Sequence, residues 1–347
     1  MTSNMVITGA AKLYRSGPLF HYCLFRFTSL HRYSSLPPVE EALKAAVEVK
    51  MYQKIPDLLS SKEAVQNPNP FSFLSTFPQN IRMQIIDEIL QSFIPLRPRF
   101  RPRIAYACLL SYTLQSPKPL PLALAILQRM LYSGCIPVPQ IHLLLSSAWL
   151  ERRCQSECVP NILLEMQSIG YRPDCGTCNY LISSLCRVDQ LVEAVKVLKG
   201  MVGAGCVPDL ESYDIVIGAM STVRKTNDAT DMLKEMVAKM GLMPRQATVV
   251  KVAVALRANR EIWKAVEMIE FLEREGTVVG FDSYEVVVEG CLECSEYILA
   301  GKVAMVMAER GLIPHIKVRQ KVVERLAGIG EWELACAVRQ RFSELRS

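Results

Sequence analysis

Apolar residues recur at spacings of three and four along most of the chain, in pairs of stretches separated by short polar turns. The clearest pair lies in 175–209, with apolar positions at Cys178, Leu181, Ile182 and Leu185 and then at Leu191, Ala194, Val195, Leu198, Met201 and Val202. This spacing is that of two amphipathic helices. Gly205 and Pro208 end the second helix, because glycine accepts the left-handed cap and proline cannot continue a helix.

The glycine that closes this pair of helices recurs at a nearly fixed interval. It stands at Gly134, Gly170, Gly205, Gly241, Gly276 and Gly311, with spacings of 36, 35, 36, 35 and 35 residues. Proline follows three positions later at Pro137, Pro173, Pro208, Pro244 and Pro314, whereas Val279 departs from the pattern. Such a period predicts an all-α solenoid of helix-turn-helix repeats, in which each hairpin buries its apolar faces against its neighbours.

The repeat pattern divides the chain into segments. About six repeats are predicted in 103–315. Upstream, 40–102 contains helical stretches interrupted by "NPNPFS", which predicts an N-terminal helical region or one further degenerate repeat. Downstream, 316–347 carries two more helical stretches without a closing Gly-x-x-Pro, and we predict a C-terminal capping hairpin there.

The hairpin "TCNYLISSLCRVDQLVEAVKVLKGMVGAGCVPD" resembles the pentatricopeptide repeat. The resemblance is carried by the 35-residue length, the opening Asn179-Tyr180-Leu181-Ile182 and the Gly-x-x-Pro-Asp ending. The Trp, Leu-Gly and Tyr pattern of the 34-residue tetratricopeptide repeat is missing. The resemblance covers roughly residues 103 to 347 and is to P-type arrays of plant organelles. It implies that the solenoid is a right-handed superhelix.

The resemblance also implies a function and a set of side chains. Repeats of this family bind single-stranded RNA at about one base per repeat. The fifth and last residues of each repeat are expected to lie together on the concave edge, and in 175–209 these are Asn179 and Asp209. The Asn amide donates and accepts, Asp orients it, and the combination implies a preference for uracil. The alternative is that Asn179 and Asp209 merely cap helices.

The other repeats carry less typical combinations at the two positions. By alignment the pairs are His142 with Asp174, Asp214 with Arg245, Glu285 with His315, Ala107 with Val138, and Val250 with Gly280. We expect the polar pairs to contribute to base reading. For each of these repeats, a plain surface position on a helical scaffold remains the alternative.

The distribution of charge limits how RNA could be held. The net charge of +6 is made up of +4 in 1–39, −2 in 40–90, +6 in 91–150 and −2 in 151–347. Without the first segment only +2 remains, and phosphate contacts normally supply most non-specific affinity for nucleic acid. The run "PLRPRFRPR" is the expected phosphate-binding segment, in an extended conformation, with Arg97, Arg99, Arg101 and Arg103. Contact with an acidic partner is the alternative.

The first 39 residues have a composition of their own. They contain eight Ser or Thr and no Asp or Glu, and their basic residues are Lys12, Arg15, Arg26 and Arg32. This composition is typical of a cleaved organelle transit peptide. Arg32 stands two positions before Ser34, which resembles a mitochondrial processing site. We predict the mitochondrial matrix, with the chloroplast stroma as the alternative.

The cysteines and histidines do not form a catalytic or metal-binding pattern. Two Cys-x-x-Cys pairs, Cys175 with Cys178 and Cys291 with Cys294, lie three repeats apart, about 30 Å if each repeat adds one helix diameter. A shared zinc site is therefore excluded, and we expect reduced thiols that pack in the core. A zinc-deaminase motif is missing, and we expect no metallonuclease domain after Phe342.

We therefore expect no enzymatic activity, no metal and no cofactor. Half of the residues are hydrophobic, yet no apolar run reaches the ~18 residues of a membrane helix, so no membrane partner is expected. Two functions remain open. The first is an organellar adaptor that binds single-stranded RNA during RNA processing, stability or translation. The second is a structural interaction protein, such as an organellar ribosome-associated subunit, without base-specific reading.

Overall fold

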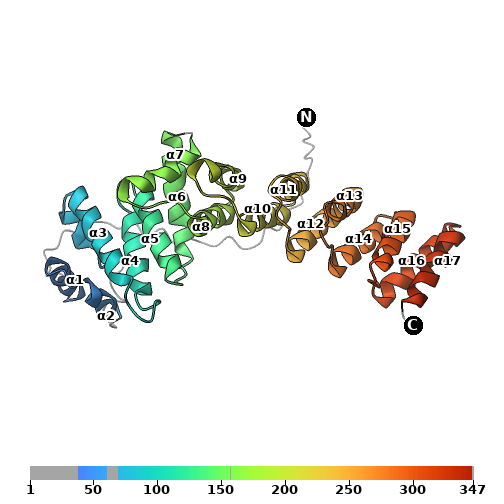
Figure 1. Cartoon of the computed structure of the whole chain (residues 1–347), viewed down its shortest axis with the longest axis horizontal. Helices are drawn as coiled ribbons and strands as arrows, with labels where there is room; N and C mark the ends of the chain where they lie inside the picture. The colour runs from blue at the N-terminus through green and yellow to red at the C-terminus, as the bar shows by residue number, and fades with distance from the viewer. Residues whose placement is uncertain (1–37, 61–68, 157, 346–347) are drawn as a thin grey trace, which may run out of the picture. The chain divides into compact units, whose positions relative to one another are not determined.

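Helical hairpins follow one another along the chain in the computed structural model, which describes residues 38–60, 69–156 and 158–345 (Figure 1). The α-helices are α1 (Pro38–Glu48), α2 (Ile55–Leu59), α3 (Gln79–Phe93), α4 (Arg103–Leu114), α5 (Leu120–Tyr132), α6 (Gln140–Gln155), α7 (Val159–Leu164), α8 (Cys175–Arg187), α9 (Leu191–Gly200), α10 (Leu210–Thr222), α11 (Thr226–Ala238), α12 (Gln246–Ala258), α13 (Ile262–Arg274), α14 (Phe281–Glu293), α15 (Tyr297–Glu309), α16 (Ile316–Gly328) and α17 (Trp332–Glu344). Short 3-10 helices include η1 (Tyr52–Lys54), η4 (Glu165–Ile169) and η5 (Val202–Ala204). No strand occurs in the described ranges, and the predicted all-α solenoid of helical hairpins is confirmed.

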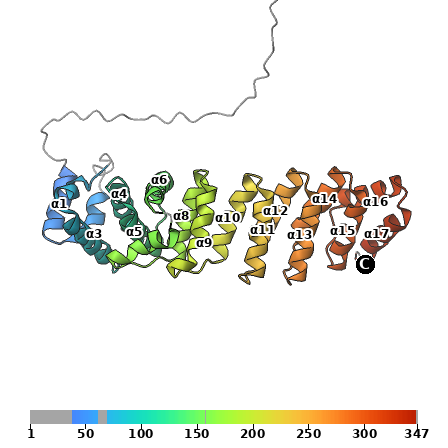
Figure 2. The ribbon, with the colours of Figure 1, turned by 90° about the horizontal axis from the view of Figure 1, so that it is seen from above.

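From α4 onward the helices pair into hairpins, α4 with α5 and so on to α16 with α17. Each even-numbered helix packs against its own partner and against the even-numbered helix of the next hairpin. These even-numbered first helices therefore form one continuous row, and the second helices lie beside it, as α11 and α13 do above α12 and α14 in Figure 1. Figure 2 shows the hairpins side by side in chain order.

The segment before α4 extends this packing. α2 contacts α4, and α3 contacts α5, so both rows continue toward the N-terminus. Lys50 and Tyr52 hold η1 to α3 through Glu88, at 3.2 and 2.6 Å. Val39 in α1 is buried. The predicted transit peptide otherwise lies outside the described residues, and its predicted end at residue 39 falls inside α1.

The predicted apolar stripes of 175–209 face the core with one exception. Leu181, Leu185 and Leu198 are almost fully buried between neighbouring helices. Val202 is instead 58% exposed, contrary to the pattern. It lies in η5, and the tighter 3-10 turn rotates this residue away from the stripe of α9.

The second hairpin departs from the regular form. α7 has only six residues and is followed by η4. The chain after α6 is extended at Ser156, and Pro160 stands in the first turn of α7, where proline is tolerated. The start of α7 packs closely on the end of α9. A Cβ atom added to Gly200 would lie 2.4 Å from Val159 Cγ1, so only glycine fits at this contact.

In the regular hairpins, a left-handed residue stands before each second helix, and another follows each second helix except α17. The six predicted linker glycines all have positive φ, for example +63° at Gly241, which confirms the cap argument. The series before the second helices stands at Lys118, Asp189, Arg224, Arg260, Ser295 and Gly330. The sequence pattern did not reveal this series, because only one of its members is glycine.

No helix in the described ranges is both long enough and apolar enough to span a bilayer.

We predict that Gly241→Ala lowers the free energy of unfolding by about 1–2 kcal/mol, the cost of a left-handed conformation for an L-residue. No atom lies within 4 Å of the added Cβ, so conformational strain is the cause. Urea denaturation followed by circular dichroism measures the change.

Gly328→Ala is the matched control. Gly328 also has open space around its Cβ position, but it ends α16 without a positive φ. Stability should stay equal or rise, since alanine favours helix. Equal losses in both variants would contradict the assignment of strain to the linker.

Candidate nucleic-acid interface

A recurring contact joins successive hairpins along the row of first helices. The fifth residue of a first helix lies against two residues of the next hairpin's start. One is the last residue of its own repeat, which is the N-cap of the next first helix, and the other is the third residue of that next helix. We call this contact a junction. In three repeats, the junction brings the two predicted base-reading residues into contact.

The junction of 175–209 is the most extensively hydrogen-bonded one. Asn179 Nδ2 donates to Asp209 Oδ1 at 3.1 Å, and Ser212 Oγ donates to Asn179 Oδ1 at 2.6 Å. The backbone N–H of Ser212 donates to the same Asp209 oxygen at 2.9 Å. The predicted pair is therefore brought together, and Asp209 also caps α10 in a capping box with Ser212. The capping alternative holds for Asp209 but not for Asn179, which is inside α8.

The electrostatics of this junction favour the charged form of Asp209. Burial alone would raise its pKa, but hydrogen bonds from the backbone of Ser212 and the amide of Asn179 outweigh burial and lower the pKa below its usual value. Asn179 itself is only 5% exposed. Among the described residues, its amide oxygen and nitrogen make one hydrogen bond each, which leaves one N–H and one oxygen lone pair.

The junction after α10 contains an ion pair. Arg245 Nη1 lies 3.0 Å from Asp214 Oδ2, and Thr248 Oγ1 donates to Asp214 Oδ1 at 2.7 Å. The Arg245 side chain is 56% exposed, whereas that of Asp214 is 11% exposed. The predicted pair is present, and its acidic member is already neutralised by its basic member.

The junction after α14 is similar. His315 Nδ1 lies 2.5 Å from Glu285 Oε2, and the backbone N–H of His315 donates to Glu285 Oε1 at 2.8 Å. The imidazole ring also meets Phe281 edge to face, with ring centroids 5.1 Å apart. The His315 side chain is 71% exposed, so the imidazole is the accessible group of this pair.

The predicted pair of His142 with Asp174 is not formed. His142 is the third residue of α6, and its Nδ1 lies 2.8 Å from Ser184 Oγ while its ring stacks on Tyr180. Burial, and then the charge of Arg187, lower its pKa. The alignment failed because α6 begins two residues later than it assumed, so the fifth residue of α6 is Leu144.

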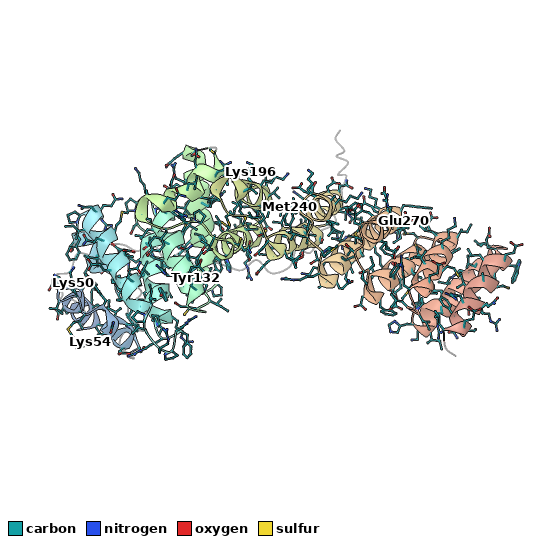
Figure 3. The ribbon with its side chains drawn as sticks, viewed as in Figure 1. Lys50, Lys54, Tyr132, Lys196, Met240 and Glu270 are labelled. Atoms are coloured by element: carbon teal, nitrogen blue, oxygen red, sulfur yellow. The ribbon has the colours of Figure 1, made fainter. Side chains whose placement is uncertain are left out.

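Asp174 is bound by other groups. It accepts from the backbone N–H of Thr177 at 2.6 Å as the N-cap of α8, and from Gln128 Nε2 at 2.7 Å. Tyr132, labelled in Figure 3, also bonds to Asp174, and this hydrogen bond, followed by burial, raises the pKa of Tyr132 to about 12. Asp174 therefore joins α5 to α8 rather than pairing with His142.

The two apolar pairs make no polar contact between their members. Ala107 is partly buried, and Val138 is 44% exposed. Near Val250 and Gly280, the polar contact comes from Gln246, whose Oε1 accepts from the backbone N–H of Gly280 at 2.7 Å. These repeats supply no reading pair.

A row of buried hydroxyl groups was missed by the sequence reasoning. The third residues of four consecutive first helices are Thr177, Ser212, Thr248 and Ser283. Ser212 and Thr248 donate to Asn179 and Asp214, the fifth residues of the preceding helices. Thr177 and Ser283 have hydroxyl oxygens without a hydrogen-bond partner in the described residues, because the corresponding fifth residues are apolar, Leu144 and Val250. The recurrence of serine or threonine at the third position of successive first helices was the sequence signal that could have revealed this row.

The four arginines of the predicted phosphate-binding run are all exposed. The run forms turns rather than the expected extended segment, with i→i+3 backbone bonds from Arg101 to Pro98 and from Arg103 to Phe100. Arg101 makes a bidentate contact to Asp57, at 2.8 and 2.6 Å, and Arg97 donates to the carbonyl oxygens of its own turn. Among the described residues, Arg99 and Arg103 have no ion-pair partner.

A second basic surface lies on α16. Lys317, Lys321 and Arg325 are spaced by four residues, so they share one exposed face, while Val318 and Val322 are buried opposite. From the sequence, this helix is predicted only as part of the C-terminal capping hairpin. The i, i+4, i+8 spacing of basic residues was the signal that could have identified the stripe.

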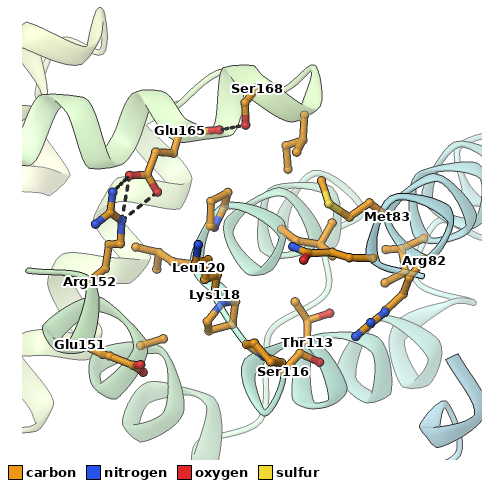
Figure 4. Close-up of a pocket in the computed structure, with 18 of the residues that line it drawn as sticks. Arg82, Met83, Thr113, Ser116, Lys118, Leu120, Glu151, Arg152, Glu165 and Ser168 are labelled. Atoms are coloured by element: carbon orange, nitrogen blue, oxygen red, sulfur yellow. Dashed lines mark hydrogen bonds and ion pairs between the residues drawn. The ribbon is translucent and has the colours of Figure 1, made fainter. Parts of the chain in front are cut away.

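A cavity of about 430 Å³ lies beside the first two hairpins, between α3, the loop before α5, α6 and η4 (Figure 4). Arg152 and Glu165 form a bidentate ion pair at its edge, at 2.9 and 3.2 Å from Arg152 Nε. Lys118, Thr113 and Arg82 also line it. The cavity contains none of the predicted reading residues, so it is separate from the junctions.

The cysteines of the two predicted Cys-x-x-Cys pairs lie in or against the core. Cys178 and Cys291 are buried, and Cys175 and Cys294 are partly buried. Within the described ranges, no group of three or more His, Cys, Asp or Glu is arranged to hold a metal ion.

Comparisons with known proteins place this geometry in context. The model of the PPR repeat family matches residues 173–222. The chain is 61% identical over 329 residues to a pentatricopeptide repeat-containing protein of Arabidopsis thaliana, covering 94% of this chain and 95% of that protein. It is 36% identical over 61 residues to small ribosomal subunit protein mL103 of the same plant, covering 18% of this chain and 15% of that protein.

Among solved structures, the chain is similar to the pentatricopeptide repeat protein PPR10 from maize, at 14% identity and a TM-score of 0.40. The match covers 89% of this chain and 54% of the maize chain, so this chain spans about half of that protein.

We predict that Asp209→Asn lowers stability at neutral pH by about 1 kcal/mol, since a charged acceptor of several hydrogen bonds becomes neutral. Because the folded pKa of Asp209 is lowered, this stabilisation is fully present above the unfolded value of about 3.9 and is lost as the pH falls through the folded pKa. Denaturation curves from pH 7 down to pH 2 should show the two proteins converging below about pH 4.

Asp231→Asn is the matched control. Asp231 is exposed in the middle of α11 and makes no hydrogen bond or ion pair in the described residues. Its stability should follow wild type within about 0.5 kcal/mol at every pH. A constant gap between wild type and Asp209→Asn across this pH range would show that the charge has no role.

Proposed function

The chain belongs to the pentatricopeptide repeat family, and we propose on this basis that it binds single-stranded RNA and acts as an organellar adaptor in RNA processing, stability or translation. Helical repeats of this family read RNA with two or three side chains per repeat. The observation that carries the proposal is the junction of Asn179, Asp209 and Ser212. It holds one amide in a defined orientation at the position where the family reads a base.

The chemistry of this junction fits a pyrimidine. Asp209 binds one N–H of Asn179 and Ser212 binds its oxygen, so the amide cannot rotate without breaking both contacts. The remaining N–H and lone pair form an adjacent donor and acceptor, which match a carbonyl and an N–H on the edge of uracil. A base that stacks over this amide would find a fixed hydrogen-bonding pattern.

The other polar junctions are less suited to base recognition than the junction of 175–209. At Asp214 and Glu285 the acidic group is already bound to Arg245 or His315. A base must compete with that contact or bind the exposed side chain of Arg245 or His315. We therefore propose that base selectivity is concentrated in 175–209, and that the other repeats position the strand.

Phosphate contacts are proposed at the two exposed basic surfaces. Arg99 and Arg103 lie near the start of the repeats, and Lys317, Lys321 and Arg325 lie on the last first helix. Arg101 is a weaker candidate because Asp57 already binds its guanidinium group. With few such contacts, RNA affinity should be modest and should fall with salt.

The second candidate function is a structural interaction protein, for instance a ribosome-associated subunit in an organelle. The observation that favours it is the state of the junctions. One is closed by the ion pair of Arg245 with Asp214, another by the contact of His315 with Glu285, and those at Leu144 and Val250 are apolar. On this alternative, the row of first helices contacts protein or folded RNA without selecting bases.

We predict that crosslinking in organelles, followed by sequencing of the bound RNA, yields a narrow footprint with uracil at one fixed position. Asn179→Val should lose that preference and bind the enriched RNA about tenfold more weakly, a change of roughly 1.4 kcal/mol. The variant should fold, because the chain already places Val250 opposite the hydroxyl of Ser283 in another repeat. Filter binding on the enriched sequence measures the loss.

Thr222→Val is the control, since its hydroxyl bonds only to the carbonyl of Gly218 within α10. RNA binding by this variant should equal that of wild type. Unchanged selectivity in Asn179→Val would remove base reading from this repeat. Co-sedimentation with ribosomal particles, without a defined footprint, would favour the structural alternative.

We predict that residues 1–39 direct a fused fluorescent protein into mitochondria. Replacing Lys12, Arg15, Arg26 and Arg32 by Gln should abolish import, because the positive charge is the feature that identifies the segment. N-terminal sequencing of the imported full chain should find a start before Pro38, which leaves α1 intact. Import into chloroplasts would select the alternative organelle, and cytosolic fluorescence would contradict both.

A further inference from the structure

Three cysteine thiols meet where the hairpin of α8 and α9 joins the next one. Cys175 is the first residue of α8, Cys178 lies one turn later, and Cys206 follows Gly205 in the linker to α10. The sulfur atoms of Cys175 and Cys206 are 3.4 Å apart. In the described part of the chain, these are the cysteines whose thiols share hydrogen bonds with one another.

The backbone holds the two sulfurs in this position. Asp174 caps α8 and fixes its first turn. Gly205 has a φ of +75° and reverses the chain, and the backbone N–H of Cys206 donates to Met201 O at 3.0 Å. Cys175 Sγ also lies 2.9 Å from the carbonyl oxygen of Val207. The contact is therefore a product of the repeat geometry and not of two mobile side chains.

The surroundings make the three thiols unequal. A hydrogen bond from Cys178, assisted by one from Cys175, lowers the pKa of Cys206 to about 7 despite its burial. Burial and the hydrogen bond to Cys206 raise the pKa of Cys175 to about 12. The thiolate is the nucleophilic form of cysteine, so Cys206 is the reactive member. Cys206 is 5% exposed, which admits only a small oxidant.

We propose that Cys175 and Cys206 form a modification site at which hydrogen peroxide produces an intramolecular disulfide. The Cys206 sulfur attacks one peroxide oxygen, the O–O bond breaks, and the leaving hydroxide takes up a proton to become water. The resulting sulfenic acid is attacked by the sulfur of Cys175, which gives up its proton. The S–O bond breaks and a second water leaves, so two thiols are oxidised and one peroxide is reduced to two waters.

The cross-link changes a defined part of the solenoid. A disulfide requires a sulfur–sulfur distance of about 2.05 Å, so the linker must move toward the start of α8. Asn179 lies one turn beyond Cys175, and Asp209 lies three residues beyond Cys206. The junction is therefore next to both ends of the bridge. An effect on RNA binding rests on the proposed function, whereas formation of the disulfide does not.

The test uses the full chain with the exposed cysteines Cys154, Cys158 and Cys336 replaced by serine, which suppresses cross-links between molecules. The protein is treated with hydrogen peroxide, free thiols are alkylated, and peptides are identified by mass spectrometry without reduction. We expect a peptide pair that joins Cys175 to Cys206 and is released by dithiothreitol. Alkylation of both residues after treatment, or a bond between Cys178 and Cys206, would overturn the proposal.

Two further variants, both checked for folding by circular dichroism, sharpen the test. Cys175→Ser should abolish the bridge and leave the sulfenic acid of Cys206, which dimedone traps when the treated protein is unfolded in its presence. Cys291→Ser removes a buried thiol from the other Cys-x-x-Cys pair and should leave the bridge at its full yield. If Cys175→Ser does not fold, the peptide measurement on the protein that lacks Cys154, Cys158 and Cys336 still tests whether the disulfide forms.

Discussion

Burial of apolar faces between neighbouring hairpins is the interaction on which the whole structure depends. A single hairpin cannot cover both of its apolar stripes, so Leu181 and Leu185 of α8 reach full burial only when α6 and α10 are in place. The same holds for each first helix from α4 to α16. Stability is consequently shared between adjacent repeats, and the row of first helices is the continuous element that orders all the junctions.

The repeat length follows from how the chain reverses direction. Each regular hairpin that is followed by another makes two sharp turns, one before its second helix and one after it, and both use a left-handed residue. The turn after the second helix uses glycine, as at Gly241, whereas the turn before it accepts Asp189 or Arg224. A left-handed conformation at a non-glycine residue is unfavourable, so the packing on both sides must hold these turns in place. The solenoid is thus maintained by local caps and neighbour contacts acting together.

These two features explain what could be predicted from the sequence. The helices and the linker glycines follow a pattern within each repeat, so their positions could be predicted from the sequence. The resemblance to a known repeat identified Asn179 and Asp209 as a pair. The pairing of His142 failed because α6 begins two residues later than the alignment assumed, and no local signal marks this shift. The arginine run was expected to be extended because of its prolines, but backbone bonds at Arg101 and Arg103 close it into turns. Contacts between hairpins, such as the hydroxyl row, depend on stacking register, which a periodic pattern alone does not determine.

The junctions show how one set of atoms serves both the fold and the proposed recognition. Asp209 accepts from the N–H of Ser212 to start α10, and the same carboxylate oxygen accepts from Asn179. Orientation of the reading amide therefore requires no group beyond those that cap the helix. Val250 is an apolar fifth residue, and the hydroxyl of Ser283 next to it has no hydrogen-bond partner in the described residues. Such a repeat has no polar group at the fifth position that could be oriented toward a base. The difference between a reading repeat and a structural repeat then lies in a single side chain, placed by a scaffold that both kinds share.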